Sequence, residues 1–159
     1  MIRVGIGHNA HRLTPGRKLI LGGVEIAYQL GLEGWSDADV LLHAIINALL
    51  GAAALGDIGT HFPYGDPKYK DASSIDLLQR VKVMLDKHGW QITNIDATII
   101  AEQPRLLPYI DKMRAKIGET LGLDPSLIGV KASSVDKLGS IGREEGIASE
   151  AVALIERRE

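Results

Sequence analysis

The chain has 159 residues, of which 45% are hydrophobic and 24% are charged, and its formal net charge is −2. This length and composition predict one globular domain over residues 1–159. The charge argues against a general nucleic-acid-binding protein, because such proteins carry a basic surface. We expect no membrane partner, because no apolar run approaches the roughly 20 residues of a membrane helix and no signal peptide is present. The absence of cysteine fits a reducing compartment, and we expect a cytoplasmic location.

The first half of the chain predicts short strands followed by a long helix. β-Branched residues that lead into glycine indicate a strand over residues 2–6. Residues 18–26 are typical of a hairpin around two consecutive glycines. The clearest helix spans residues 37–55, where apolar side chains follow helical spacing. We expect either Ser36 or Asp37 to cap its first turn.

The second half alternates between helices and strands. Apolar stripes predict helices over residues 73–88 and 107–121. Strands are expected over residues 91–101, 128–133 and 146–155. The whole order predicts an α+β sandwich, in which helices cover one face of a mixed β-sheet.

The last predicted strand bears on the other face of that sheet. Residues 148–155 are apolar except for Ser149 and Glu150, which is typical of a strand that is buried on both sides. In a chain this short, contact with another subunit is the expected cover. The pattern therefore predicts an oligomer without fixing the number of subunits.

Three side chains suggest a metal site. Asn9 and His11 lie two positions apart, so their side chains point the same way on an extended chain. His43 lies within the predicted helix over residues 37–55. Three such ligands with an open fourth position describe a catalytic zinc site. The alternative is a partly buried histidine that is hydrogen-bonded to a carbonyl group.

Two segments carry a family resemblance. Ser36-Asp37-Ala38-Asp39-Val40-Leu41-Leu42-His43-Ala44 runs on into a helix that ends near Gly56-Asp57-Ile58-Gly59, and Lys137-Leu138-Gly139 follows near the other end. Together with residues 7–11, they resemble the 2-C-methyl-D-erythritol 2,4-cyclodiphosphate synthases of the non-mevalonate route to isoprenoids. The resemblance spans essentially the whole chain and implies a homotrimer with active sites between neighbouring subunits.

The resemblance implies a reaction of the phosphorus–oxygen lyase class. In this reaction, 4-diphosphocytidyl-2-C-methyl-D-erythritol 2-phosphate becomes 2-C-methyl-D-erythritol 2,4-cyclodiphosphate and CMP. Zinc, or another divalent transition metal, is implied at Asn9, His11 and His43, and Mg²⁺ or Mn²⁺ with the diphosphate at Asp136. An anion or isoprenoid diphosphate is implied in a central cavity near Arg143, with a simple Arg–Glu pair as the alternative there.

The resemblance also assigns roles to single residues. Trp35 and Ser134 stand at the catalytic positions of the family. The residues implied to contact this cytidine-diphosphate-type substrate are Asn9, His11, Ser36, Asp57, Gly59, Phe62, Asp66, Ala101, Pro104, Arg105, Leu106, Leu107, Ser133, Asp136, Ser140 and Arg143.

Five positions depart from the family pattern: the family has aspartate at Asn9, Asn47 and Tyr64, histidine at Trp35 and glutamate at Asp136. A neutral asparagine gives less charge to a dication, so weaker metal binding is expected. Tryptophan offers one N–H donor and cannot be a cation. Two hypotheses follow: a cyclodiphosphate synthase of reduced activity, or a catalytically impaired or engineered trimeric binding protein on the same scaffold. A metallohydrolase is disfavoured, because no general base stands beside the proposed metal.

Overall fold

The computed structural model describes all 159 residues. Its main sheet has the strand order β4-β1-β7-β5-β6, and β2 and β3 form a separate hairpin. Strands β5 and β6 are parallel, whereas the other neighbouring pairs are antiparallel. The elements are β1 (Ile2–Pro15), β2 (Leu19–Leu21), β3 (Val24–Ile26), β4 (Leu30–Leu32), α1 (Val40–Ala52), α2 (Ile58–His61), the 3₁₀ helix η1 (Pro67–Tyr69), α3 (Ser74–Lys87), β5 (Trp90–Ile100), η2 (Leu107–Tyr109), α4 (Ile110–Leu121), η3 (Pro125–Leu127), β6 (Ile128–Ser133), α5 (Gly139–Gly142) and β7 (Gly146–Arg157).

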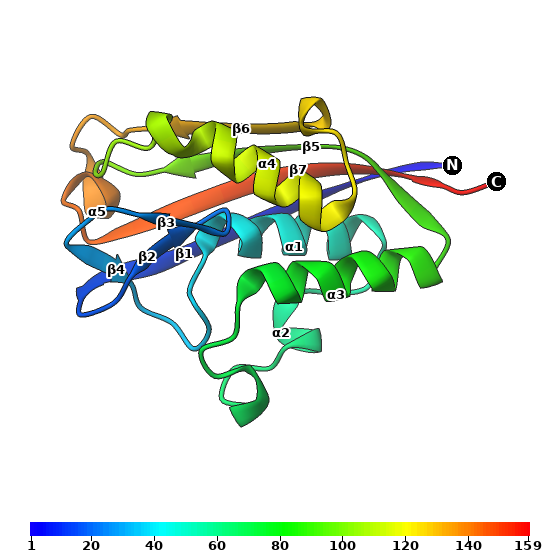
Figure 1. Ribbon diagram of the computed structural model, residues 1–159, viewed down its shortest axis with the longest axis horizontal. Coiled ribbons are helices and arrows are strands. Elements are labelled where there is room, and N and C mark those ends of the chain that lie inside the picture. The colour runs from blue at the N-terminus through cyan, green and yellow to red at the C-terminus, as the bar shows by residue number, and fades with distance from the viewer.

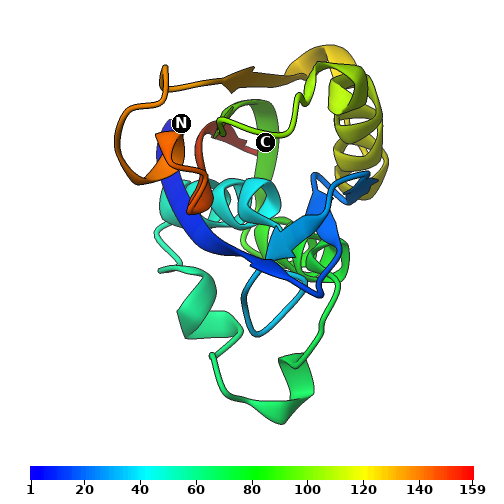
Figure 2. The same cartoon turned by 90° about the vertical axis from the view of Figure 1, so that its left-hand side faces the viewer.

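The long helices lie on one face of this mixed sheet. Helix α1 packs across β1 and β7, α3 lies beside α1, and α4 lies beside α3 and against β6 (Figures 1 and 2). The buried apolar side chains form one core of 39 residues. The segment that holds α2 and η1 projects beyond α1 and α3, on the side away from β6, in both views. The predicted α+β fold with a mixed sheet is confirmed, and the homotrimer stays a prediction.

Two glycines let β1 lie directly on α1. A Cβ atom at Gly5 would come within 2.0 Å of the carbonyl oxygen of Ala48, and one at Gly7 within 1.9 Å of that of Ala44. No larger residue fits these positions, because real Cβ atoms do not approach backbone oxygen so closely. The close contact fixes the following residues of β1 over the first turns of α1, where the site lies.

The first strand is much longer than the predicted strand over residues 2–6. It continues to Pro15, because β7 pairs with it from Ile2 opposite Glu156 to Arg12 opposite Gly146, and β4 pairs with its last three residues, 13–15. The backbone hydrogen bonds of residues 7–12 are therefore satisfied by a strand from the far end of the chain.

Helix α1 is shorter than predicted, and the expected cap is wrong. Ala38 has φ +57°, a left-handed conformation that a helix cannot contain, so the helix starts at Val40. Asp39 is the cap: its Oδ1 accepts from the backbone N–H of Leu42 at 3.0 Å. The helix ends at Ala52, two residues before Ala54 adopts φ +57°.

The remaining predictions hold with small changes. The hairpin over residues 18–26, the helix over residues 73–88, and the strands over residues 91–101 and 128–133 are present within two residues at each end. The third helix begins as a 3₁₀ turn. Five short elements were not predicted: β4, α2, η1, η3 and α5.

Strand β7 is covered on one face only. Ala151 and Ala153 face α1 and are buried, whereas Glu150 and Val152 point to the opposite face and are exposed. The expected burial on both faces is thus not provided by a single chain. The outer face of the sheet is left open to a partner or to solvent.

Candidate functional site

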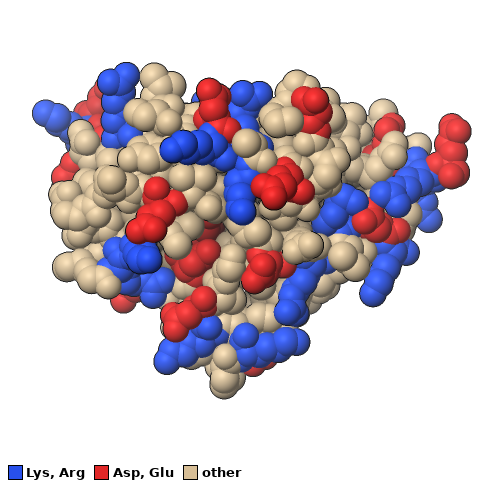
Figure 3. All heavy atoms as spheres, in the orientation of Figure 1, with Lys and Arg blue, Asp and Glu red and all other residues tan.

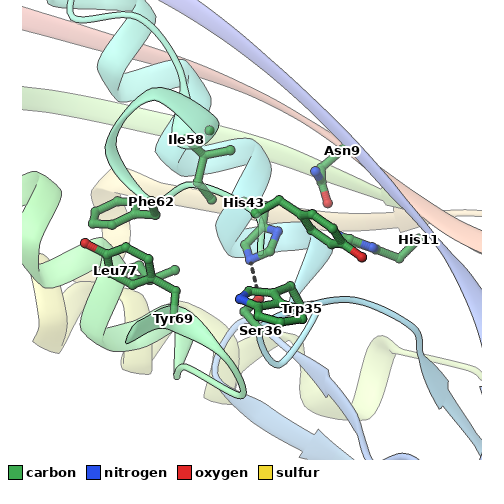
Figure 4. A pocket seen from close by; sticks show the side chains of 11 residues that line it. Asn9, His11, Trp35, Ser36, His43, Ile58, Phe62, Tyr69 and Leu77 are labelled. Atoms are coloured by element: carbon green, nitrogen blue, oxygen red, sulfur yellow. Dashed lines mark hydrogen bonds between the residues drawn. The ribbon is translucent and has the colours of Figure 1, made fainter. Parts of the chain in front are cut away.

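The first cavity lies between β1, the loop before α1, and the projecting segment with α2 and η1. Its volume is about 180 Å³. Figure 4 shows side chains from all of these elements turned toward it. The lining residues are Asn9, His11, Trp35, Ser36, His43, Ile58, Gly59, Phe62, Tyr64, Tyr69 and Leu77.

The three predicted metal ligands meet in this cavity. The rings of His11 and His43 are 5.6 Å apart between centroids, at an interplanar angle of 71°. Asn9 Oδ1 and His11 Nε2 are buried and have no hydrogen-bond partner. Buried polar atoms without a partner are costly and rare. Two such atoms in one cavity, beside a second imidazole, point to a ligand that these atoms hold.

Both imidazoles favour their neutral form. Burial lowers the pKa of His43 to about 3, and the neighbouring His11 adds to this shift. Burial is also the main cause that lowers the pKa of His11. Neutral histidine is the form that binds metals. Two imidazole nitrogens and one amide oxygen fit a borderline divalent transition ion, although the set carries no negative charge.

Asn9 is an essential member of this donor set. No three His, Cys, Asp or Glu side chains gather at distances suited to a metal. The two histidines therefore need the amide oxygen of Asn9 to complete three ligands. Asp136, the residue predicted to hold the second divalent ion, is exposed and does not line this cavity.

Ser74 belongs to the surroundings of His43 and was missed by sequence reasoning. Its Oγ lies 2.9 Å from His43 Nε2, and Ser36 Oγ lies 3.3 Å from the same nitrogen. Ser74 is the first residue of α3, 31 positions after His43 in the chain. No local pattern predicts this contact, because the two helices meet only in the folded chain.

Trp35 and Tyr64 form part of the cavity wall. Their ring centroids are 5.4 Å apart, and Trp35 Nε1 donates to the main-chain carbonyl of Asp66 at 2.9 Å. The Asp66 carboxylate accepts from the backbone N–H of Lys68 and caps η1. Asp66 itself is not among the lining residues. The Asp66 side chain and the single N–H donor of Trp35 are therefore both engaged in hydrogen bonds that stabilise the cavity wall.

Asp57 and Asn47 hold α2 in place. Asp57 caps α2, because its Oδ1 accepts from the backbone N–H of Thr60 at 2.9 Å and from its hydroxyl at 2.8 Å. These hydrogen bonds lower the pKa of Asp57. The Asn47 Oδ1 atom accepts from the backbone N–H of Ile58 at 2.8 Å. Asp57 therefore starts a new helix instead of forming the C-terminal turn of α1, and Gly59 beside it reaches the cavity.

A second cavity lies where the parallel strands β5 and β6 end. Its volume is about 250 Å³. Parallel strands present their carboxyl ends at one edge, which is a common place for ligand binding. The predicted residues Ala101, Pro104, Arg105, Leu106, Leu107, Ser133 and Ser134 all line it, with Glu102, Gln103 and Ala132.

The loop after β6 has an unusual backbone beside this cavity. Asp136 and Lys137 have φ +51° and +63°, which is uncommon outside glycine and often marks functional sites. The backbone N–H of Lys137 donates to Glu102 Oε1, which ties the loop to the second cavity. A Cβ atom at Gly142 would lie 2.1 Å from the backbone of Lys137, so only glycine fits there.

The last two predicted contact residues, Ser140 and Arg143, are exposed after this loop. Arg143 Nε forms an ion pair with Glu145 Oε2 at 2.7 Å. The Arg–Glu alternative is therefore present, and the anion near Arg143 stays a prediction. The two cavities share no lining residue. The structure thus gathers most of the predicted site residues into two separate groups within one chain, and five line neither cavity: Asp57, Asp66, Asp136, Ser140 and Arg143.

Comparison with known proteins decides the family. Residues 2–156 match the model of the YgbB family. The chain belongs to this family. A 2-C-methyl-D-erythritol 2,4-cyclodiphosphate synthase from Dehalococcoides mccartyi is 54% identical over 157 residues, which cover 99% of this chain and 100% of the relative. The synthase of the same description from Moorella thermoacetica is 56% identical over 158 residues, or 99% of this chain and 97% of the relative.

Solved structures of related proteins have the same fold. The bifunctional IspDF from Campylobacter jejuni matches all of this chain with a TM-score of 0.96 at 39% identity, and this chain spans 43% of that protein. IspF from Plasmodium falciparum, solved as a CDP complex, matches 99% of this chain, and 97% of its own, with a TM-score of 0.88 at 31% identity. The resemblance inferred from the sequence is confirmed, and the relatives named as synthases favour the enzyme over the binding protein.

The surface charges and the lengths of the helices bear on the predictions about nucleic-acid and membrane partners. On the face in Figure 3, lysine and arginine are interspersed with aspartate and glutamate, without a single basic stripe. None of the helices combines the length and the apolar character needed to cross a bilayer. The cytoplasmic location stays a prediction.

Proposed function

We propose that the chain converts 4-diphosphocytidyl-2-C-methyl-D-erythritol 2-phosphate into 2-C-methyl-D-erythritol 2,4-cyclodiphosphate and CMP. One observation carries the proposal: the unpaired buried atoms Asn9 Oδ1 and His11 Nε2 face the first cavity beside His43. The second cavity adds to this support, because it collects the residues that the family resemblance assigns to the cytidine end of the substrate. The names of the curated relatives describe the same activity.

The substrate supplies its own nucleophile in the proposed reaction. An oxygen of the 2-phosphate attacks the β-phosphorus in line, the new P–O bond closes the ring, and the bond to the CMP oxygen breaks. The protein contributes positioning and charge stabilisation, which are the main effects in phosphoryl transfer. A bound transition ion would be held by Asn9, His11 and His43 and would supply Lewis-acid polarisation of a phosphate oxygen.

The remaining residues hold the two ends of the substrate. Backbone groups of residues 101–107 would bind the cytosine, and the hydroxyls of Ser133 and Ser134 would donate to the diphosphate. Asp136 would hold Mg²⁺ or Mn²⁺ through water, since Mg²⁺ keeps several waters in protein sites. The first cavity, with Ser36 and Phe62 in its wall, would take the methylerythritol phosphate.

A homotrimer joins the two cavities in this proposal. Ile2, Val4 and Ile6 on the outer face of β1 are 66%, 66% and 74% exposed, and Val152 beside Ile6 on β7 is 45% exposed. A contiguous apolar strip of this kind is typical of a subunit interface. Assembly around it would bring the first cavity of one subunit against the second cavity of its neighbour, so that each site is shared.

We propose that the activity of this chain is reduced. Asn9 gives the metal no charge, and the N–H of Trp35 is used by the Asp66 carbonyl. The experiment is to incubate the purified protein with the substrate, Zn²⁺ and Mg²⁺, and to measure CMP by chromatography. CMP that appears with metal, and not with a chelator or with the His43→Ala variant, supports the function. No CMP from any preparation that holds both metals contradicts it.

A further inference from the structure

A continuous chain of hydrogen bonds leads from the first cavity to Asp37. His43 Nε2 lies 2.9 Å from Ser74 Oγ, and the Ser74 hydroxyl donates to Asp37 Oδ1. The backbone N–H of Ser74 donates to Asp37 Oδ2 at 2.9 Å. Ser74 is fully buried and His43 nearly so. Solvent therefore offers no alternative partner for the Ser74 hydroxyl, and its geometry is set by these two neighbours.

The directions of these hydrogen bonds follow from the number of hydrogens. A serine hydroxyl has one hydrogen, and the carboxylate of Asp37 can only accept. The hydrogen of Ser74 is therefore used toward Asp37. The Ser74 oxygen must then accept from a hydrogen on His43 Nε2, because two lone pairs facing each other at 2.9 Å would repel.

Ser36 does not change this assignment. Its Oγ is 3.3 Å from His43 Nε2, longer than the Ser74 contact, and it accepts from the backbone N–H of Ala38 at 3.2 Å. It can receive a minor share of the same Nε2 hydrogen. Its own hydrogen then remains free for a ligand in the first cavity, which Ser36 lines.

We propose that Asp37 and Ser74 are positioning residues that hold His43 in its Nε2–H tautomer, so that Nδ1 presents a lone pair to the cavity. Figure 4 shows the other ring nitrogen of His43 turned toward the side where Asn9 and His11 lie. The second ring nitrogen of a metal-binding histidine commonly donates its N–H to a carboxylate. Here a serine hydroxyl stands between the two groups. The use of the Nδ1 lone pair for a metal rests on the proposed function, whereas the tautomer does not.

The hydrogen bonds from His43 through Ser74 to Asp37 give a specific role to the Asp37 carboxylate, which lies outside the neutral donor set. Asn9, His11 and His43 bring no negative charge to the ion. Asp37 is linked to His43 through Ser74, so its carboxylate raises the basicity of the imidazole without entering the cavity. It also holds the first N–H of α3, which fixes the position of Ser74 against α1.

The tautomer can be measured directly in metal-free protein. Two-bond ¹H–¹⁵N spectra of ¹⁵N-histidine-labelled protein distinguish Nε2–H from Nδ1–H for each of the five histidines. We expect Nε2–H at His43 in the unmodified chain and a mixture or Nδ1–H in Ser74→Ala. Ser74→Thr keeps the hydroxyl and should restore Nε2–H. Ser73→Ala is the matched control, because the Ser73 side chain is exposed and makes no capping hydrogen bond.

Zinc affinity gives a second readout. We expect Ser74→Ala to bind Zn²⁺ on the order of 10–100-fold more weakly, as is usual when the partner of a ligating histidine is removed. Ser73→Ala should bind zinc like the unmodified chain. If Ser74→Ala does not fold, Asp37→Asn replaces it. The new amide can donate to the Ser74 oxygen, so the Ser74 hydroxyl hydrogen turns toward His43 Nε2. His43 should then carry its hydrogen on Nδ1.

Two results would overturn the proposal. One is Nδ1–H at His43 in the unmodified chain. The other is a folded Ser74→Ala variant with the Nε2–H tautomer and an unchanged zinc affinity. A chain that binds no zinc at any concentration contradicts the proposed function instead, and the tautomer measurement still decides the role of Asp37 and Ser74.

Discussion

Trp35 and Asp66 are joined by a hydrogen bond of 2.9 Å from the indole Nε1 to the main-chain carbonyl oxygen. The indole has no second donor. Trp35 therefore stabilises the wall of the first cavity, packed against Tyr64, and has no hydrogen left for a phosphate. This relationship, together with the neutral Asn9, is the physical basis for expecting a slow enzyme.

Restoring a donor at position 35 should raise the rate of CMP release. One transition-state donor is worth about 10²–10³ in rate. Trp35→His combined with Asn9→Asp should gain more than either change alone, and the two gains should not simply multiply, because both groups act on one phosphate. The measurement is CMP release from the four proteins of this cycle. An unmodified protein that turns over at about 1 s⁻¹ or faster would show that both residues are tolerated.

Asn9→Asp should tighten metal binding by itself. A carboxylate brings charge to the ion, so we expect at least about a 10-fold gain in zinc affinity, comparable to the effect of partners outside the ligand set. Dialysed unmodified protein should retain well under one zinc per chain. Asn94→Asp, which adds the same charge at an exposed position on β5, is the control. Stoichiometric zinc in the unmodified protein, with no gain from Asn9→Asp, would contradict the prediction.

Buried His43 should lower the stability of the metal-free protein as the pH drops below about 6.5, opposed by buried Asp39, whose pKa is raised by burial to about 7. The unfolded chain protonates His43 near its ordinary pKa, whereas burial holds the folded pKa to about 3. The unfolded state therefore binds more protons between these values, and each pH unit costs about 1.4 kcal/mol per proton.

Urea unfolding at pH 7 and pH 4.5 checks this expectation. Over this interval His43 alone should cost on the order of 2–3 kcal/mol of unfolding free energy, and this cost should be absent in His43→Gln. The exposed His8→Gln variant should keep the pH dependence of the unmodified chain. Equal pH dependence in the unmodified chain and in His43→Gln would show that the buried imidazole is not the cause.

Lysine on the two faces of β7 should have different effects. Val152→Lys places a charge on the outer, exposed face, so we expect a folded chain that no longer assembles. Ala153→Lys places it on the fully buried inner face against α1, where an unpaired charge costs several kcal/mol and should unfold the chain. Light scattering and circular dichroism measure both outcomes. A Val152→Lys variant that remains trimeric would exclude this face as the interface.

The regular elements could be predicted from the sequence because their periodic patterns are local. Apolar spacing located α3 and the strands β5 and β6 closely. The pattern did not extend β1 beyond residue 6, because the pairing up to Arg12 is provided by β7, more than 130 residues away, and the last three residues pair with the short strand β4. The short helix α2 was missed for a related reason. It depends on the Asp57 cap and on the Asn47 side chain, and it has no apolar period of its own.

The site was predicted in part. The spacing of Asn9 and His11 indicated a shared direction, and the structure places both beside His43. The cap of α1 could not be chosen from sequence, because Ser36, Asp37 and Asp39 all have suitable side chains. The choice is made by tertiary contacts, since Asp39 also accepts from the backbone N–H groups of Gly22 and Gly23.

The most direct test of the proposed reaction follows the phosphorus atoms during turnover in ¹⁸O-labelled water. Cyclisation closes a ring through the β-phosphorus with an oxygen of the substrate's own 2-phosphate, so no oxygen from water enters. Hydrolysis would instead place one ¹⁸O from water in a linear phosphate product. With the unmodified chain, Zn²⁺ and Mg²⁺, we expect ³¹P NMR to show one cyclic diphosphate, free of ¹⁸O, for each CMP released. A linear phosphate that carries ¹⁸O, or substrate that stays intact with both metals bound, would contradict the assignment of this chain as a cyclodiphosphate synthase.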